Sequence, residues 1–126
     1  MRYMMFIKHT EDYEPGDVPA SLYQAMGAFI EEATRNGHFI DGAGLQPMAA
    51  GARIRLQKGT ISVIDGPFAE AKEVVGGYAI IDAASHDEAL QFARRFMELH
   101  RTHWPAFEGE CEVRPFEAMR SATEPG

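Results

Sequence analysis

The chain has 126 residues, of which 45% are hydrophobic and 25% are charged, and its formal net charge is −7. This length allows one hydrophobic core, and the composition is typical of an ordered globular domain. The negative charge disfavours nucleic acid, because affinity for a phosphate backbone depends on Lys and Arg side chains that displace counterions. We therefore expect a single soluble domain with no nucleic-acid partner.

The cysteine content and the first apolar run bear on where the protein works. Cys111 is the single cysteine, so it has no intramolecular disulfide partner, and a reducing compartment fits it best. The apolar run from Met4 to Ile7 is interrupted by Lys8, which makes it too short for a signal peptide or a membrane span. We expect a cytoplasmic protein that does not bind membranes.

The first third of the chain predicts strand, helix and strand. Residues 3–9 are a short apolar run with aromatic and branched members, typical of a buried strand. Asp17 is placed to cap a helix entered through Pro19, and apolar residues recur at three- and four-residue spacing until Asn36 and Gly37. Residues 38–40 then predict a short strand that runs into a loop rich in glycine.

The middle of the chain predicts a hairpin followed by a central strand. Residues 52–57 alternate between apolar and polar, turn at Lys58-Gly59 and return as 60–64. The first arm is expected at a sheet edge, because arginines occupy one of its faces. Residues 74–81 are apolar at odd and even positions alike, so both faces of this strand should be covered.

The last third predicts a helix and a short strand. Ser85 and Glu88 have the spacing of a capping box ahead of an apolar helical stripe. Residues 111–116 predict the final strand. His100 and His103, on that second helix, have HxxH spacing but no third ligand in sequence, so we expect no metal site.

These elements suit a ferredoxin-like α+β fold: an antiparallel sheet with two helices on one face. The strands at 3–9 and 74–81 are apolar on both faces, so the face away from the helices also needs a cover. The simplest cover is the same sheet face of a second copy of the chain, so we expect a homodimer. Loops folded over the sheet of a monomer are the alternative. Residues 1–118 form the domain, and 119–126 form a flexible tail.

The segment from Val63 to Tyr78 strongly resembles the DGPF signature of YCII-related proteins, through Asp65-Gly66-Pro67-Phe68. Residues 42–47 and 112–117 are similar to the same family's pattern. The resemblance implies a dimeric α+β barrel, in which two ferredoxin-like sheets face each other across clefts. YCII-like relatives carry a histidine in the first helix, where this chain has Met26.

The DGPF turn and the residues after it form the first candidate site. A loop held between two strands often presents ligand contacts, and Pro67, Phe68, Lys72 and Glu73 are the candidates. Lys72 would hold an anionic oxygen, and Asp65 or Glu73 would act as a base. A purely structural turn is the alternative, since Asp, Gly and Pro each favour turns, and so is a turn that only stabilises the dimer.

Two further candidates lie outside that loop. Asp41 ends a predicted strand beside glycines, where it would abstract a proton at a pocket rim or simply shape a turn. His9 lies on the same strand face as Tyr3 and Met5, so it would point into a cavity and relay a proton, or it is only a polar strand end.

The function these features favour is a cofactor-independent enzyme that uses acid–base chemistry on a small anionic or aromatic compound, as an isomerase, lyase or hydrolase. The cleft would lie near the DGPF loop. The alternative is a non-catalytic ligand-binding or regulatory protein with a protein partner. Some DGPF-type relatives are associated with extracytoplasmic-function sigma factors, and an acidic surface suits a basic protein.

Overall fold

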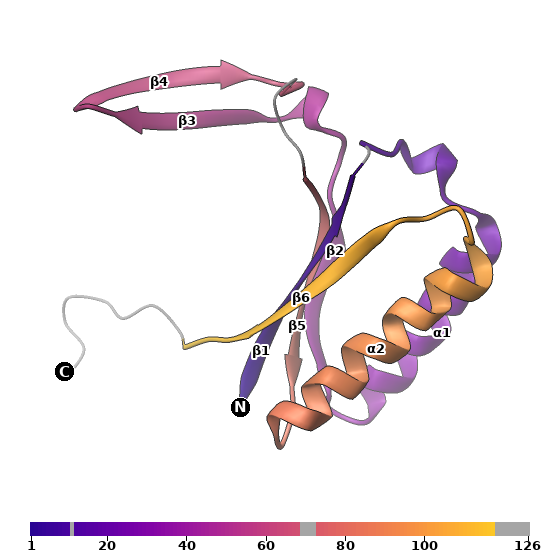
Figure 1. Cartoon of the computed structure of the whole chain (residues 1–126). Helices are drawn as coiled ribbons and strands as arrows, with labels where there is room; N and C mark the ends of the chain where they lie inside the picture. The colour runs from indigo at the N-terminus through magenta and orange to yellow at the C-terminus, as the bar shows by residue number, and fades with distance from the viewer. Residues whose placement is uncertain (11, 69–72, 118–126) are drawn as a thin grey trace, which may run out of the picture.

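The computed structural model describes residues 1–10, 12–68 and 73–117 and has an α+β architecture (Figure 1). The predicted tail, 119–126, lies outside the described residues. The elements in chain order are β1 (Arg2–His9), a short 3-10 helix η1 (Pro15–Asp17), α1 (Ala20–Arg35), β2 (Phe39–Gly44), a second 3-10 helix η2 (Met48–Ala50), β3 (Ala52–Gln57), β4 (Thr60–Asp65), β5 (Val74–Asp82), α2 (His86–His103) and β6 (Gly109–Pro115).

The main sheet has four antiparallel strands in the order β2-β5-β1-β6. Both helices pack on one face of it, as Figure 1 shows. The predicted ferredoxin-like α+β fold is therefore confirmed for the single chain, and β5 lies inside the sheet as its two-sided apolar pattern predicted. The pairing of two such sheets in a dimer stays a prediction.

The core lies between the sheet and the helices. Tyr3 and Met5 lie on the face of β1 that points toward the helices, and Ala79 and Ile81 lie beside them on β5. Phe29 of α1 and Phe92 of α2 meet above these strands with ring centroids 4.9 Å apart. The same core contains four alanines, Ala33, Ala83, Ala89 and Ala93. His9, the last residue of β1, lies on the same face, so it borders the hydrophobic core.

The β3–β4 hairpin forms where the sequence predicted it, with Lys58 and Gly59 at positive φ in its turn. It is a separate two-stranded sheet, so β3 is an edge strand as predicted, but of this small sheet and not of the main one. Figure 1 shows the hairpin projecting from one end of the main sheet toward the side away from the helices. Alternation along a strand fixes which residues share a face, but it does not fix which sheet the strand joins.

Two predicted helix caps differ in outcome. Asp17 does not cap α1: it ends η1, its carboxylate accepts a hydrogen bond from the Glu14 N–H at 2.9 Å, and the residue before α1 is Pro19. Ser85 does cap α2, since its hydroxyl accepts from the Glu88 N–H at 3.1 Å. Pro19 is the N-cap residue of α1, and its carbonyl oxygen accepts from the Leu22 and Tyr23 N–H groups at 3.0 and 3.3 Å, so the helix begins without a side-chain cap.

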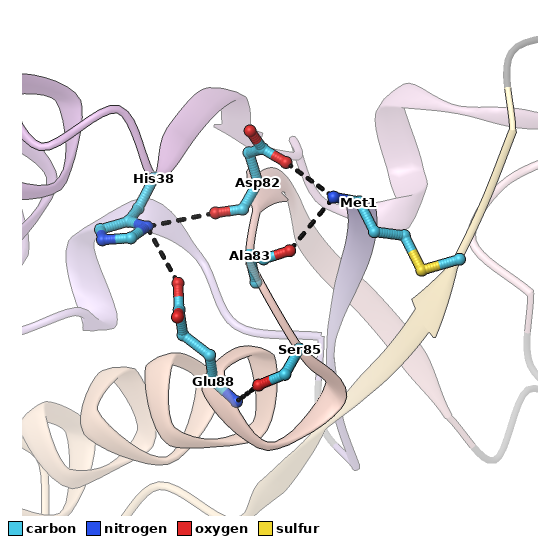
Figure 2. Close-up of polar contacts among 6 residues, drawn as sticks. All are labelled: Met1, His38, Asp82, Ala83, Ser85 and Glu88. Carbon is cyan, nitrogen blue, oxygen red and sulfur yellow. Dashed lines mark hydrogen bonds and ion pairs between the residues drawn. The ribbon is translucent and has the colours of Figure 1, made fainter.

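Glu88 turns away from the expected capping box and joins a polar group at the far end of the sheet (Figure 2). Its carboxylate lies 3.4 Å from His38 Nδ1, which is also 3.2 Å from the Asp82 carbonyl oxygen. The amino group of Met1 lies 3.1 Å from the Asp82 carboxylate and 3.1 Å from the Ala83 carbonyl oxygen. The Met1 contacts tie the chain start to the β5–α2 connection. The His38 contacts tie the start of β2 to β5 and α2, so His38 has a structural role.

Strand ends differ from the sequence prediction at two places. The strand predicted at 38–40 runs instead to Gly44, because β2 pairs with β5 along 39–44 despite its glycines. The last strand starts at Gly109 rather than Cys111. In the part of the chain that the structure describes, no helix is long and apolar enough to span a membrane.

Candidate functional site

A cavity of about 560 Å³ opens between the helix-facing side of the sheet, the two helices and the loops that follow β1 and β2. Its volume falls within the roughly 300–1,000 Å³ of ordinary small-molecule sites. Strands β1, β2 and β5 supply its floor, α1 and the last turn of α2 its walls, and residues 12–15 and 45–47 its rim. This is the place where ionisable side chains from distant parts of the sequence meet.

His9 lies at the floor of this cavity. Only 9% of the residue is exposed, its ring lies 4.9 Å from the Tyr13 ring between centroids, and Phe107 meets it edge-on. Nearby on β5 is Gly76, at the irregularity in the β1–β5 pairing, where an added Cβ would collide with Nε2 and Cδ2 of His9. The absence of a side chain at Gly76 therefore makes room for the imidazole.

His100, in the last turn of α2, lines the same cavity and is 6% exposed. Its Nδ1 lies 3.1 Å from the Phe96 carbonyl oxygen, which can only accept, so Nδ1 carries the hydrogen and Nε2 keeps a lone pair. Burial lowers the pKa of His100 below its ordinary value of 6.5, against the opposing effect of the Phe96 hydrogen bond. At neutral pH this side chain is an uncharged base.

An aromatic cluster forms the wall beside the two histidines. Trp104 lies 4.7 Å from Tyr13 and 5.1 Å from Phe107, measured between ring centroids, and His100 lies 4.8 Å from Phe107. Flat rings in contact present π faces and edges to whatever enters the space beside them. The wall is thus suited to a planar or aromatic ligand.

Asp12, at the rim, is bound to the backbone of the loop after β2. Its two carboxylate oxygens lie 3.2 and 3.0 Å from the Met48 N–H, which donates to them. This contact fixes the segment after β2, so Asp12 positions the rim of the cavity.

The DGPF turn lies outside the lining and supports that same segment. The Gly66 N–H donates to the Gly51 carbonyl at 2.9 Å, and a Cβ on Gly66 would overlap the Met48 carbonyl group. Phe68 lies under the Arg53 guanidinium, 3.9 Å from ring centroid to Cζ. Asp65 and Pro67 are exposed. A ligand-contacting role for this turn stays a prediction, while Gly66 packs against the Met48 backbone and so has a structural role.

The remaining candidates also lie apart from the cavity. Asp41 is exposed at the edge of the sheet, where its carboxylate accepts from the adjacent Gly42 N–H at 2.8 Å. Glu73 is exposed and lies 3.7 Å from Lys8, which bonds more closely, at 2.6 Å, with Glu112. Lys72 lies outside the described residues. Of the sequence candidates among the described residues, His9 lines the cavity, whereas Asp41, Asp65, Pro67, Phe68 and Glu73 do not.

Sequence reasoning missed His100, Tyr13 and Asp12. The HxxH spacing drew attention to a metal, yet His103 does not line the cavity, and no group of three metal-binding side chains occurs among the described residues. The four-residue spacing of Phe96 and His100 was the available signal for a buried, backbone-bonded histidine. Burial also raises the pKa of Cys111 to about 11, so its thiol is a poor nucleophile.

A model of the YCII-related domain family matches residues 1–100. The chain belongs to the YCII-related family. An uncharacterized protein of Rhizobium meliloti (strain 1021) is 45% identical over 73 residues, which are 58% of this chain and 55% of that protein. The match thus spans about half the length of that relative.

A solved structure is also similar to this YCII-related chain. It is the 5-chloro-2-hydroxyhydroquinone dehydrochlorinase TftG from Burkholderia phenoliruptrix AC1100 in complex with 2,5-dihydroxybenzoquinone. The TM-score is 0.47 and the identity 18%, with 93% of this chain and 94% of that chain covered. Met26 stands where the resemblance expects a histidine, and it lines the same cavity as His9 and His100.

Proposed function

We propose that this YCII-related protein is a cofactor-independent enzyme that moves protons on a small aromatic or cyclic compound bound in the cavity. The observation that carries the proposal is that two buried histidines, His9 from β1 and His100 from α2, line one cavity and both contact Phe107. Proton-transfer catalysis needs at least two titratable groups that converge on one substrate.

The two histidines have different surroundings, and we assign them different roles in proton transfer. His100 is held neutral with Nε2 as acceptor, so it takes a proton from the substrate. His9, packed against the Tyr13 ring, relays or returns a proton, as the strand pattern predicted. An isomerisation or elimination needs this pair of steps: removal of a proton at one atom and delivery at another.

The proposed substrate follows from the shape and lining of the site. The aromatic ring of the substrate would stack against Trp104 and Phe107. The Tyr13 hydroxyl and the two histidines would supply its polar contacts. The roles predicted for Asp41, Asp65 and Lys72 stay predictions, as do the cytoplasmic location and the absence of a cofactor. Ligand binding without turnover is the alternative function.

A ligand screen by thermal shift tests whether a ligand binds in the cavity or at the DGPF turn. We expect a hydroxylated or carboxylated aromatic compound, at 100 times its Kd, to stabilise the wild type by about 2.7 kcal/mol and to raise Tm by several degrees. The shift should shrink in His9→Asn, which alters the cavity floor, and persist in the matched carboxylate-to-amide variant Asp65→Asn.

The opposite pattern, a shift kept by His9→Asn and lost in Asp65→Asn, would move the site to the DGPF turn. Each compound that binds is then incubated with the enzyme and followed by absorbance and mass spectrometry. Turnover supports the enzyme, whereas binding with unchanged ligand would favour the ligand-binding or regulatory role.

A further inference from the structure

The cavity has two halves with different linings. Both helices lie on one face of the main sheet (Figure 1), but α1 contacts β2 at one edge and α2 contacts β6 at the other. The half beside α2 holds His9, His100 and the aromatic wall. The other half is lined from α1, β2 and β5, and we call six of its residues the apolar half: Leu22, Met26, Ile30, Gly42, Gly44 and Gly77.

No charged side chain from α1, β2 or β5 lines the cavity, and the structure describes these three elements from end to end. Met26 stands where the resemblance expects a histidine, so this side carries a thioether in place of a titratable ring. A methionine side chain is flexible and polarisable and adapts its shape to an apolar neighbour. The apolar half therefore favours an apolar group, because no charge there loses its hydration when water is displaced.

The floor of the apolar half lacks side chains on two neighbouring strands. Gly44 of β2 pairs with Gly77 of β5, and Gly77 pairs with Ile7 of β1, so the three residues form one row across the sheet. Neighbouring strands lie about 4.8 Å apart, so the two glycines leave a depression two strands wide. Ile7 and His9 are two residues apart on the same face, so this depression leads toward the histidines.

Gly44 differs from the other two floor glycines, because nothing in the fold requires a glycine there. A Cβ on Gly77 would lie 2.9 Å from the Ala43 carbonyl oxygen. A Cβ on Gly42 would lie 2.8 Å from the Tyr78 carbonyl oxygen. A Cβ on Gly44 would meet nothing within 4 Å, and the φ of Gly44 is not positive. Gly44 thus keeps open a space that a side chain could enter.

We propose that the apolar half is a second subsite, which takes an apolar substituent on the substrate ring, and that Gly44 sets its depth. The cavity holds about 560 Å³, whereas an apolar cavity of about 150 Å³ is enough for benzene. A single ring beside His9 and His100 therefore leaves much of the space unfilled. The subsite rests on the proposed function, since it binds the part of the ligand that the histidines do not contact.

Phenol, 4-ethylphenol and 4-butylphenol, titrated into the wild type by calorimetry, measure the subsite. Each fully buried methylene tightens binding by about 4-fold, so the Kd of 4-butylphenol should be roughly 10-fold or more below that of phenol. Equal Kd values for the three compounds, or no binding of 4-butylphenol at millimolar concentration, would overturn the proposal.

Gly44→Val fills the depression without meeting another part of the protein. It should raise the Kd of 4-butylphenol by about 10-fold or more and change that of phenol by less than about 3-fold. The variant should melt no lower than the wild type, because valine is favoured in strands over glycine. Gly27→Val, on the exposed side of α1 and away from the cavity, is the matched control and should change neither Kd. Unchanged binding of 4-butylphenol by Gly44→Val would contradict the subsite.

Met26→His tests the opposite wall by introducing the residue that the resemblance expects. The Kd of 4-butylphenol should rise by about 10-fold, because the alkyl chain then displaces water from a polar ring. Met26→Leu, which keeps the volume and the apolar character, should stay within about 3-fold of the wild type. A Met26→His variant that binds 4-butylphenol as tightly as the wild type would remove Met26 from the subsite.

The subsite and the proposed enzyme fail in different measurements. Binding that strengthens with alkyl length but leaves every compound unchanged supports the subsite and contradicts the enzyme. Turnover of a compound whose binding does not strengthen with alkyl length supports the enzyme and contradicts the subsite.

Discussion

Replacing Gly66 with alanine is expected to lower the free energy of unfolding by about 2–3 kcal/mol. The new Cβ would overlap the Met48 carbonyl oxygen and lie 2.7 Å from the Met48 carbonyl carbon. Both are backbone atoms of Met48, whose N–H donates to Asp12 and whose carbonyl oxygen accepts from the Gly51 N–H, so no side-chain rotation relieves the clash. The substitution should therefore loosen the base of the β3–β4 hairpin and the cavity rim together.

Urea denaturation of wild type and variant measures this difference. Gly27→Ala makes the same chemical change on an exposed position of α1, where an added Cβ meets nothing within 4 Å. It should raise the free energy of unfolding by roughly 0.5–1 kcal/mol, because alanine favours the helix. If Gly66→Ala were as stable as the wild type, the packing explanation of the DGPF glycine would be wrong.

His100→Gln is expected to lower kcat/KM by about 100-fold or more for a compound that the cavity turns over. Glutamine retains hydrogen-bonding groups of similar reach but cannot accept a proton at neutral pH. The loss should appear in kcat, because the proton is transferred in the transition state and not on binding. His103→Gln on the same helix is the control, since His103 does not line the cavity.

The pH dependence identifies which state of His100 is active. Since burial lowers its pKa below 6.5, the neutral base persists under mildly acidic conditions, and the rate should fall only as pH drops through that lowered pKa. His100→Gln should lack this limb. A variant that keeps the wild-type rate, or a limb that persists in it, would remove His100 from the proton transfer.

The same shift predicts how stability depends on pH. The unfolded chain takes up a proton at His100 at a higher pH than the folded chain does, so the contribution to stability is complete above 6.5. It is lost as pH falls from there through the lowered folded value. The wild type should therefore lose stability in this window by a term that is absent from His100→Gln.

The elements could be predicted from sequence wherever a local pattern decides them. Alternation along β1 placed His9 beside Tyr3 and Met5, and the Ser85 hydroxyl capped α2 as its spacing indicated. Asp17 was assigned as a cap because residue type alone suggested it, but the chain continues through η1 before α1 begins. Local signals locate an element better than they locate its first residue.

The candidate site could not be predicted in the same way, because it depends on contacts between distant segments. His9 and His100 come from β1 and α2 and line one cavity only after the helices pack on the sheet. The DGPF motif was the most specific signal in the sequence, yet Gly66 acts by packing beneath Met48 rather than at the cavity. A specific motif reveals a constrained backbone as readily as it reveals chemistry.

The most direct test of the central claim is a pH titration of the imidazole signals of His9 and His100 by NMR, with and without a compound that raises Tm. The predicted result is a neutral His100 with its hydrogen on Nδ1 and a pKa below 6.5, and signals of both histidines that move when the compound binds. A His100 that titrates at or above 6.5, or a ligand that leaves both imidazoles unchanged, would contradict an acid–base site in this cavity.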